Sequence, residues 1–552
     1  MILPRLKADL LLLHAPAFFY FRNRRDIYFP FLGTSGDVPI TPLYEYFPFG
    51  FKTLQRFLED RGHEVRILNL SSLLIRYPLL ELDQLLEAVD VRIIGIDLHW
   101  MIHVQGSLAV AETIKRVRPD IKVMFGGISS TYFAHQLVQY PFVDMVMRGY
   151  DTHIPLDQLL TLEAGEEPSR VANLLWKNKN GDIRANEFSH LPDTFSCGAD
   201  WSKPPESNSK RKSVPILEVL STQNAGCAYN CGWCGGSREA FRRIYGRQKA
   251  MARKPLEEVR YEFETLSRLP QNGNYHFYAV GSYNESRSGM EHFLDCVGET
   301  NLKSISYEQF HLTPDDVLRR MVKANKRSII TLSPESHDPR IAKLAGRGVY
   351  TNDEMERWIE RALDLGIHQI DIWYFVGMPQ QDEASVMETV RYSERLLRLF
   401  KDKRVNPMVC PMIPFLDPAS TFFEFPEKHG YKVFYRTVEE HRRGNERASL
   451  INRINYETDC LSRSDLVYVG FQAVRRLMEA KAEIGALPKG IVLDYVANVD
   501  DSLRFIKEVH AVDDIKSPRE RASALAELGN DILRRNNKIF FSGVANQAYP
   551  IN

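Results

Sequence analysis

Short apolar runs alternate with amphipathic stretches through the first 160 residues. Phe51, Leu54 and Leu58 share one face of a helix that Gly62 can end. Strands that alternate with helices are typical of a parallel sheet covered by helices on both faces. The sequence therefore predicts an α/β, doubly wound, Rossmann-like domain over residues 1–160. Its buried strands are expected at residues 10–13, 65–68, 91–96, 122–125 and 143–147.

The next segment, residues 161–213, is polar and rich in turn-forming residues. This composition predicts a linker with a small hairpin and a flexible, charged end. From residue 214 to 430, apolar runs again alternate with amphipathic stretches, of which residues 355–365 are one. We expect a domain of six strands that alternate with helices here. Its six strands are predicted at residues 214–220, 275–280, 304–308, 328–332, 369–375 and 407–411.

The last part of the chain, residues 431–552, has a mainly helical pattern. Leu466, Val469, Ala473 and Leu477 recur at steps of three and four residues, which places them on one face of a helix. A helical C-terminal domain is therefore expected. Its pattern fits two roles equally, a packing domain and a wall of the substrate pocket.

Composition and charge narrow the classes of partner that this protein is expected to bind. The chain has 552 residues, with 71 Lys plus Arg and 71 Asp plus Glu. This balance gives no reason to expect nucleic acid or a membrane surface as a partner. The apolar run after Lys7 is short, Asp9 interrupts its start, and no run approaches the roughly 20 apolar residues of a membrane span. The basic residues between Arg238 and Lys254 are interpreted as a solvated helix face, with a phosphate site as the alternative.

Three cysteines form the most informative motif. Cys227, Cys231 and Cys234 offer three thiolates at spacings of four and three residues. Three thiolates can bind three irons of a [4Fe-4S] cluster and leave the fourth iron open, whereas closed clusters and structural zinc sites use four ligands. A disulfide with a spare thiol, or a distorted zinc knuckle, is the alternative.

The remaining cysteines are Cys197, Cys296, Cys410 and Cys460, and they are scattered singly. Their spacing predicts no second cluster. Free thiols and an exposed cluster favour a reducing compartment, so a cytoplasmic location is expected.

The cysteine spacing, Trp233 before the last cysteine, and the following Gly235 and Gly236 resemble the radical S-adenosylmethionine superfamily. The resemblance implies that the open iron binds the amino and carboxylate groups of S-adenosylmethionine. It further implies that an electron from the cluster cleaves the sulfonium to a 5'-deoxyadenosyl radical. The fold it implies for residues 214–430 is a partial (β/α)6 TIM-type barrel. An external electron donor of the flavodoxin or ferredoxin type is implied as a partner.

The resemblance also suggests residues that hold S-adenosylmethionine at the carboxyl ends of the barrel strands. Gly281 and Ser282 stand where the family has a Gly-Gly-Glu segment that binds the methionine amine, although this chain has no glutamate there. Glu308, Ser333 and Glu335 are at positions that hold the ribose hydroxyls and the carboxylate. The turn at Gly377 corresponds to the segment beside the adenine. Polar residues and turns are also ordinary features of barrel rims.

A doubly wound domain ahead of such a barrel resembles the cobalamin-dependent branch of the superfamily. The resemblance implies a cobalamin site around three loops, and glycines there would allow close approach to the flat macrocycle or its tail. The alternative is any flavodoxin-like domain with tight turns. The residues implied in cobalamin binding are His99, Trp100, Gly126, Gly127, Ser129, Arg148 and Gly149.

One departure concerns the cobalt ligand. Cobalamin sites of the methionine-synthase type carry Asp-x-His-x-x-Gly after the first strand, but here His14 is followed by Ala-Pro-Ala-Phe-Phe. We therefore expect that no imidazole binds cobalt from below. His14, His99 and His103 are interpreted as packing or hydrogen-bonding residues rather than metal ligands.

The resemblance implies methyl transfer to an unactivated carbon, or to phosphorus, through a 5'-deoxyadenosyl radical and methylcobalamin. The substrate is expected to be a small molecule or a peptide. A radical cyclase or rearrangement enzyme that uses cobalamin without methyl transfer is the alternative, and a non-catalytic cobalamin or redox sensor is an alternative of another class. A methylthiotransferase is rejected, because no cysteine precedes Cys197 to hold its second cluster.

Two aromatic-rich segments, residues 18–31 and 44–51, add a hint about the surroundings of the cofactors. Either segment suits a cover over the corrin or a hydrophobic pocket, and simple core packing explains both equally well.

Overall fold

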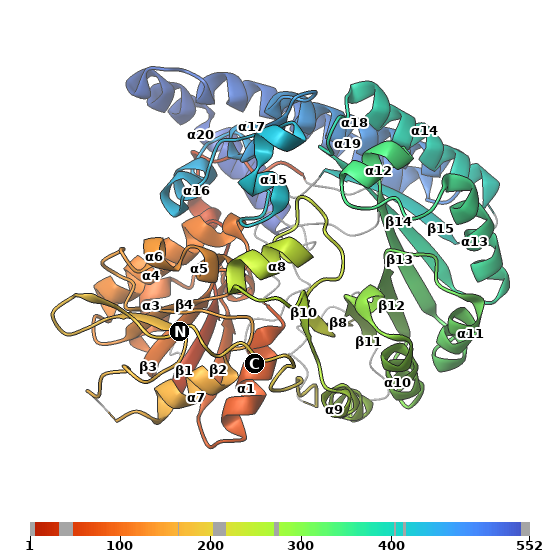
Figure 1. Ribbon diagram of the computed structural model, residues 1–552. Helices are drawn as coiled ribbons and strands as arrows, with labels where there is room; N and C mark the ends of the chain where they lie inside the picture. Colours follow the sequence, from red (N-terminus) through yellow and green to blue (C-terminus); the bar gives the residue numbers. More distant parts are fainter. Residues whose placement is uncertain are drawn as a thin grey trace.

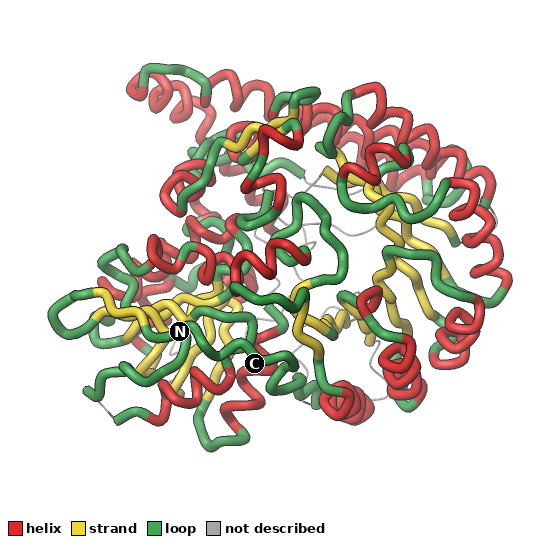
Figure 2. Tube along the Cα trace, viewed as in Figure 1, coloured by secondary structure: helices red, strands yellow, loops and turns green. Residues whose placement is uncertain are grey.

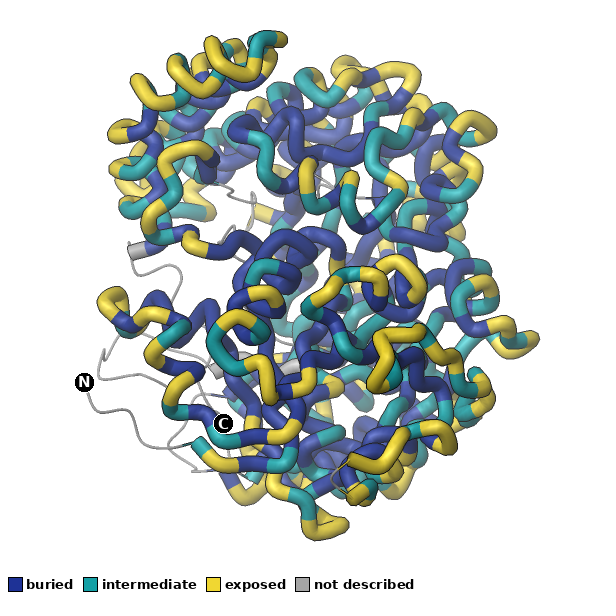
Figure 3. The backbone as a smooth tube through the Cα atoms, turned by 90° about the vertical axis from the view of Figure 1, so that its left-hand side faces the viewer, coloured by how far each residue is buried: buried dark blue, intermediate teal, exposed yellow. Residues whose placement is uncertain are grey.

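The computed structural model describes residues 6–31, 48–163, 165–202, 217–269, 275–401, 404–411 and 416–541. These residues form two large sheets with covering helices, two small two-stranded sheets, and a helical C-terminal segment that reaches from one large sheet to the other (Figure 1). Buried residues concentrate in the middle of the molecule, and exposed residues lie on the outer helices and loops (Figure 3).

The N-terminal sheet has seven strands in the order β2-β1-β3-β4-β5-β6-β7. Neighbours from β2 to β5 are parallel, whereas β5, β6 and β7 pair antiparallel. All five strands predicted for the doubly wound domain are confirmed. The strands are β1 (Leu6–His14), β2 (Val65–Asn69), β3 (Val89–Asp97), β4 (Lys122–Gly126), β5 (Met145–Met147), β6 (Leu174–Lys177) and β7 (Ile183–Ala185).

The hairpin β6-β7 was expected inside a linker, and that placement is wrong. Its first strand pairs with β5, where Met145 lies opposite Trp176. Trp176 is 4 % exposed and donates from Nε1 to Oδ1 of Asn186 at 3.0 Å. The segment up to residue 185 therefore packs with the N-terminal sheet, because an apolar strand gains more by joining a sheet edge than by staying in solvent.

Helices cover the N-terminal sheet, and the helix predicted from Phe51, Leu54 and Leu58 is confirmed as α1. Gly62, with φ +90°, follows the end of the first helix, and Pro119 follows α4. The elements are η1 (Phe21–Asn23), α1 (Gly50–Glu59), α2 (Leu70–Arg76), α3 (Leu82–Glu87), η2 (Met101–His103), α4 (Val104–Val117), α5 (Ile128–Tyr132), α6 (Ala134–Leu137) and α7 (His153–Thr161).

The second sheet is parallel throughout, in the order β15-β14-β13-β12-β11-β8. It curves, with its helices on the outer side (Figure 2). The predicted six-stranded partial barrel is confirmed, although residues 214–216 of its first strand lie outside the described residues. The strands are β8 (Leu217–Thr222), β11 (Tyr275–Val280), β12 (Ser304–Gln309), β13 (Ser328–Glu335), β14 (Gln369–Val376) and β15 (Val405–Pro411).

Between the first two barrel strands, a short pair precedes and follows the cysteine loop, namely β9 (Asn224–Gly226) and β10 (Met251–Arg253). The predicted outer helix over residues 355–365 is confirmed as α13. The helices of the barrel are α8 (Arg238–Tyr245), α9 (Leu256–Ser267), η3 (Ser282–Asn284), α10 (Arg287–Gly298), α11 (Asp315–Ala324), α12 (Pro339–Leu344), α13 (Asn352–Asp364) and α14 (Glu383–Leu399).

The C-terminal segment is mainly helical, as predicted. Leu466, Val469, Ala473 and Leu477 are all buried on α18, which packs against α14 and β15 of the barrel. The elements are α15 (Thr421–Glu424), η4 (Pro426–His429), β16 (Tyr431–Val433), α16 (Val438–Asn445), α17 (Leu450–Arg453), β17 (Tyr456–Thr458), α18 (Arg463–Glu483), α19 (Lys489–Asp513) and α20 (Pro518–Phe541).

This segment also returns to the N-terminal sheet. Tyr132 donates to Oε1 of Glu424 at 2.7 Å, and Asn445 donates to the backbone oxygens of Met101 and Ile102 at 3.1 Å each. The C-terminal segment therefore connects the two sheets through buried polar contacts.

The aromatic-rich segment 18–31 packs into this junction. The ring of Phe29 lies 5.2 Å from that of Phe540 on α20, and its backbone N–H donates to Asn536 at 2.9 Å. Tyr28 packs edge-on against Phe505 of α19 at 4.7 Å. Of the roles considered, core packing is therefore the one the structure gives to this segment. Of the second aromatic-rich segment, residues 44–47 lie outside the described residues.

No helix in the described part of the chain is both long enough and apolar enough to cross a membrane.

Candidate cofactor sites

The cysteine loop follows β9 at the carboxyl end of the barrel sheet. Cys227 and Cys231 are 7 % and 4 % exposed, and the backbone N–H groups of Tyr229 and Gly236 donate to the sulfurs of Cys227 and Cys234 at 3.2 and 3.3 Å. Burial raises the pKa of Cys231 to about 12 and that of Cys234 well above its ordinary value. Buried thiolates therefore need adjacent positive charge, which the irons of a cluster provide.

Neighbouring loops fix the backbone of the cysteine loop. Gly232 donates to the carbonyl of Ala345 at 3.1 Å, and Gly235 donates to Oδ2 of Asp417 at 2.9 Å. A Cβ on Gly346 would lie 2.6 Å from the carbonyl oxygen of Asn230. The loop is thus held by contacts from two other parts of the barrel.

A hydrogen-bond network joins this loop to the residues expected at S-adenosylmethionine. Gly281 donates to Oε2 of Glu308 at 2.9 Å, and Ser282 donates to the carbonyl of Glu308 at 2.7 Å. Asn284 accepts from the backbone of Ala228 beside Cys227 at 3.0 Å. Three predicted residues, Gly281, Ser282 and Glu308, are therefore brought together next to the cysteines.

Glu335 and Arg347 form a buried pair beside the cluster loop. Arg347 donates from Nε to Oε1 of Glu335 at 3.0 Å, and its guanidinium carbon lies 3.1 Å from the ring centre of Phe310. Glu335 is fully buried and has a positive φ of 71°. Nη1 of Arg347 and Oε2 of Glu335 are buried and have no hydrogen-bond partner among the described residues. Such unsatisfied groups are rare in native proteins and point to a missing ligand.

Sequence reasoning missed Arg347, since it lies in a loop twelve positions after Glu335 and outside any motif. The other two residues predicted at S-adenosylmethionine, Ser333 and Gly377, have no hydrogen bond, among the described residues, to the network around Glu308. Ser333 is 8 % exposed on β13. Gly377, with φ +92°, accepts at its carbonyl from Tyr431 at 2.7 Å, and a Cβ there would meet the hydroxyl of Tyr456 at 2.7 Å.

The loops expected at cobalamin lie together after β3 and β4. Leu98 donates to the carbonyl of Gly126 at 2.7 Å, and Ser129 donates to the carbonyl of His99 at 2.9 Å. Trp100 remains 38 % exposed. Gly127 has φ +109°, and a Cβ on it would lie 2.9 Å from the carbonyl oxygen of Leu98. These loops can be close to each other because glycine stands at that position.

Arg148 and Gly149 follow β5. The backbone N–H of Gly149 donates to Oγ1 of Thr131 in α5 at 3.0 Å, which places Gly149 beside the β4 loop. The guanidinium of Arg148 turns away and donates to the carbonyls of Asn173 and Asn186 at 3.0 and 2.8 Å. Burial lowers the pKa of Arg148. The side chain of Arg148 is therefore engaged by the hairpin connection and not by the other predicted cobalamin residues.

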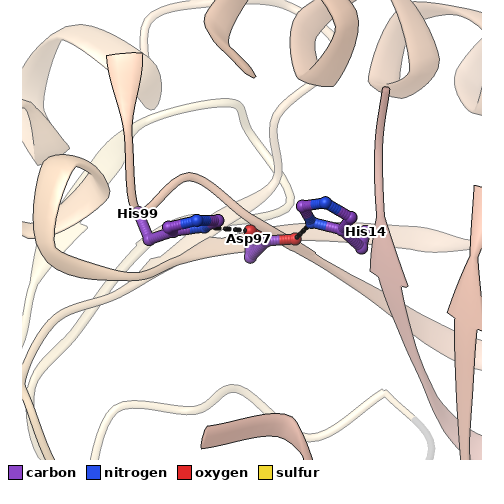
Figure 4. A group of neighbouring side chains, drawn as sticks. All are labelled: His14, Asp97 and His99. Atoms are coloured by element: carbon purple, nitrogen blue, oxygen red, sulfur yellow. Dashed lines mark hydrogen bonds and ion pairs between the residues drawn. The ribbon is translucent and has the colours of Figure 1, made fainter. Parts of the chain in front are cut away.

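At the same sheet edge, Asp97 links two histidines (Figure 4). Nδ1 of His14 lies 2.9 Å from Oδ1 of Asp97, and Nδ1 of His99 lies 2.6 Å from Oδ2. Burial raises the pKa of Asp97, but the two imidazoles outweigh burial and hold it well below its usual range. The ring of His103 lies 4.8 Å from that of His14, and burial lowers its pKa.

The hydrogen-bonding roles predicted for His14 and His99 agree with these contacts. One ring nitrogen of each histidine and a carboxylate oxygen of Asp97 lie within 4.8 Å of one another, a spacing that can also hold a metal ion. In Figure 4, however, the carboxylate stands between the rings, and each Nδ1 faces a different oxygen. This geometry is that of a hydrogen-bonded bridge, which orients both imidazoles.

Two family models match separate parts of the chain. The model of the B12 binding domain matches residues 37–156, and the model of the radical SAM superfamily matches residues 224–393. No curated protein matches the chain.

Two solved structures resemble the chain over nearly its whole length. The radical S-adenosylmethionine methyltransferase TsrM from Kitasatospora setae, with cobalamin and a [4Fe-4S] cluster bound, is 15 % identical at a TM-score of 0.53. The match covers 97 % of this chain and 100 % of TsrM. The cobalamin-dependent S-adenosylmethionine radical enzyme OxsB is 12 % identical at a TM-score of 0.55, with 98 % of this chain and 80 % of OxsB covered. At these identities the likeness shows a shared fold.

The two domain matches bring their cofactors with them: cobalamin for the B12-binding domain, and S-adenosylmethionine with a [4Fe-4S] cluster for the barrel. The residues fit these groups, since the barrel offers three buried sulfurs with backbone donors and the sheet edge offers a loop that requires glycine. The chain is therefore a radical SAM enzyme with a B12-binding domain.

Proposed function

We propose that this enzyme transfers a methyl group to an unactivated carbon, or to phosphorus, of a small-molecule substrate. The observation that carries the proposal is the union of a B12-binding sheet and a three-cysteine barrel loop in one chain. The two bound cofactor systems would supply a methyl group and a carbon-centred radical. An unactivated C–H carbon is not nucleophilic enough to attack a sulfonium directly, which is why both are needed.

The side chains of this protein would bind and orient the cluster and S-adenosylmethionine. The three cysteines would hold the cluster, and Glu308 with Gly281 would form one wall of the S-adenosylmethionine site. The unsatisfied Nη1 of Arg347 suits a carboxylate, and Oε2 of Glu335 suits an ammonium or hydroxyl group. We assign both side chains to S-adenosylmethionine, whose amino-acid end carries these charges.

On the B12-binding sheet, we assign His99, Trp100, Gly126, Gly127, Ser129 and Gly149 to the cobalamin site. Gly127 would allow the close approach of a flat ring or nucleotide tail that a Cβ would prevent. Arg148 would affect this site indirectly, by fixing the backbone beside it. Its guanidinium donates to the carbonyls of Asn173 and Asn186, which flank the hairpin β6-β7.

The test uses anaerobically reconstituted protein with dithionite or reduced flavodoxin, S-adenosylmethionine and cobalamin. Mass spectrometry would follow 5'-deoxyadenosine, S-adenosylhomocysteine and the gain of one methyl group by substrate. Cys231→Ala should abolish all cofactor turnover, whereas Cys460→Ala, which alters an exposed cysteine, should leave it intact.

Each outcome separates the candidates. Cofactor cleavage with a substrate product of altered connectivity but no added methyl group would favour a radical cyclase or rearrangement enzyme. A reducible cluster without any turnover, across substrates, would favour a sensor. Turnover that persists in Cys231→Ala would refute the assigned cluster site.

A further inference from the structure

Residues 416–422, which include the start of α15, pack against the cysteine loop. The backbone N–H of Asp417 donates to the carbonyl of Trp233 at 3.2 Å, and that of Phe422 donates to the carbonyl of Gly232 at 2.8 Å. A Cβ on Gly232 would lie 2.2 Å from the ring of Phe422. The segment therefore contacts both residues that separate the last two cysteines of the loop.

The position of Asp417 in this segment is fixed by its neighbours. The side chain of Asn455 accepts from the N–H of Leu416 at 2.8 Å and donates to the carbonyl of the same residue at 3.3 Å, and both residues are fully buried. Ala419 has φ +67°, a left-handed conformation that is uncommon for a residue with a Cβ. Such strain persists only where the surroundings determine the backbone. Asp417 is thus held at a defined place beside the cysteines.

The carboxylate of Asp417 adjoins the turn that follows the third cysteine. Its Oδ2 accepts from the backbone N–H of Gly235 at 2.9 Å. A Cβ on Gly235 would lie 2.9 Å from Cβ of Asp417, so this close approach requires glycine. The next N–H, from Gly236, donates to the sulfur of Cys234 at 3.3 Å. Asp417 therefore orients a turn that makes a hydrogen bond to a cysteine sulfur.

Asp417 also brings a negative charge to this turn. Among the described residues, no cation forms an ion pair with it. The other charged groups beside the loop differ in this respect, because the guanidinium of Arg347 is paired with the carboxylate of Glu335. In the part of the chain that the structure describes, Asp417 is therefore an uncompensated anion next to the third cysteine.

An anion at this place affects how readily a cluster on the three cysteines accepts an electron. Reduction adds one negative charge to the cluster, and a fixed negative charge nearby disfavours that addition, most strongly where the local dielectric constant is low. Net charge and hydrogen bonds to the sulfurs are among the factors that set the potentials of iron–sulfur clusters. The N–H groups that donate to Cys227 and Cys234 favour the reduced state, whereas the charge of Asp417 opposes it.

We propose that Asp417 is a positioning residue that holds the turn after the third cysteine and lowers the reduction potential of the cluster. A lower potential makes the reduced cluster a stronger one-electron donor to the sulfonium of S-adenosylmethionine. The electron comes from an external low-potential reductant, and the carboxylate is unchanged by the transfer. The inference rests on the cluster site assigned under the proposed function and is independent of methyl transfer.

Asp417→Asn separates the charge from the hydrogen bond, because the amide oxygen can still accept from Gly235. The full-length protein with its reconstituted cluster is titrated with dithionite, and EPR measures the reduced fraction at each potential. Cobalamin is left out, since cob(II)alamin gives its own EPR signal. Burial raises the pKa of Asp417 to about 6, so the titration is made at pH 8. Asp417→Asn should shift the reduction equilibrium about tenfold toward the reduced cluster, which is about 59 mV for one electron.

Asp417→Ala removes both the charge and the acceptor. It should raise the potential as Asp417→Asn does, and it should also bind less iron, since the N–H of Gly235 loses its partner. Iron and sulfide content after reconstitution measure the second effect, and circular dichroism of the apoprotein verifies folding. Where a variant binds only part of its iron, the potential is measured on the fraction that carries a cluster.

Glu427→Gln is the matched control. Glu427 is exposed on η4, which follows α15, so this substitution removes the same charge from the same part of the chain. Solvent and salt screen a charge at that position, and the potential should therefore stay unchanged.

Three results would overturn the inference: an unchanged potential in Asp417→Asn, a shift of the same size in Glu427→Gln, or equal iron content in Asp417→Ala and Asp417→Asn. Failure of the proposed cluster site is distinguishable, because the unaltered protein itself would then give no reducible [4Fe-4S] signal. Failure of methyl transfer would appear only in the products of turnover.

Discussion

Arg347 and Glu335 hold each other in the interior, 3.0 Å apart, with side-chain exposures of 4 % and 0 %. Glu335 is the last residue of β13, and Arg347 follows α12. Their ion pair therefore holds the segment between them, which includes α12, at the rim of the barrel. Because Gly346 precedes Arg347 and touches the cysteine loop, the pair also sets the position of that loop.

Replacing Arg347 should strongly destabilise the fold. Arg347→Met leaves the Glu335 carboxylate buried without its cation, which typically costs about 3–5 kcal/mol. The double variant Arg347→Met with Glu335→Leu should lose less stability than Arg347→Met alone, since it removes both buried charges. Denaturant titrations of the folded protein would measure both free energies of unfolding.

The exposed pair Arg391 and Glu388, at 58 % and 56 % exposure, is the comparison for that experiment. Arg391→Met should leave the free energy of unfolding nearly unchanged, because solvent screens an exposed ion pair. If Arg347→Met were equally mild, the buried pair would not be a structural element of the rim.

Gly346→Ala should reduce cluster incorporation. Gly346 has φ +96°, and its added Cβ would meet the Asn230 carbonyl at 2.6 Å and Cα of Cys231 at 2.9 Å. The cysteine loop would have to move, so iron content after reconstitution should fall markedly. Gly485→Ala shares the left-handed backbone, with φ +76°, but its Cβ meets no atom within 4 Å. That control should keep its iron, and equal iron in both variants would contradict the predicted anchoring.

Acid should weaken the fold through His441. This residue is fully buried on α16, and burial lowers the pKa of its imidazole to about 4. The unfolded chain, with an ordinary pKa near 6.5, binds a proton between pH 6.5 and 4 that the folded chain does not, so stability falls as pH drops through that window. The loss attributable to this residue should reach about 3 kcal/mol.

His441→Phe should lack this part of the acid sensitivity, which urea unfolding at pH 7 and pH 4.5 would reveal. His135→Phe, at an exposed position, should behave like the unaltered protein. A His441→Phe variant with the full acid response would assign the effect to other groups.

Asn445→Ala should loosen the contact between α16 and the B12-binding domain. Its side chain donates to the carbonyls of Met101 and Ile102, which directly follow the His99 and Trp100 loop. Two buried carbonyls would lose their donor, at a cost of about 1–3 kcal/mol. Thermal unfolding and the dissociation rate of cobalamin, followed by absorbance, should both change. Asn498→Ala, which removes an exposed contact to Asp494, should change neither.

The sequence allowed most of the fold to be predicted, because buried strands of parallel sheets are apolar runs bounded by turns. The placement of the hairpin β6-β7 failed since its polar surroundings gave no sign that Trp176 would pair with the N-terminal sheet. Edge pairing depends on surfaces that form only after the sheet exists.

The candidate sites were predictable where local spacing encodes chemistry, as it does for Cys227, Cys231 and Cys234. Arg347 and the Asp97 bridge to His14 were not predictable, because their partners are 12 and 83 residues away in sequence and no spacing rule links them.

The contact of α20 with the first residues has a consequence for biosynthesis. Phe21 and Phe29 both rest against Phe540, so the aromatic face of residues 18–31 stays uncovered until α20 has been synthesised. Chains that stop before α20 would leave this apolar surface exposed and should therefore be prone to aggregation.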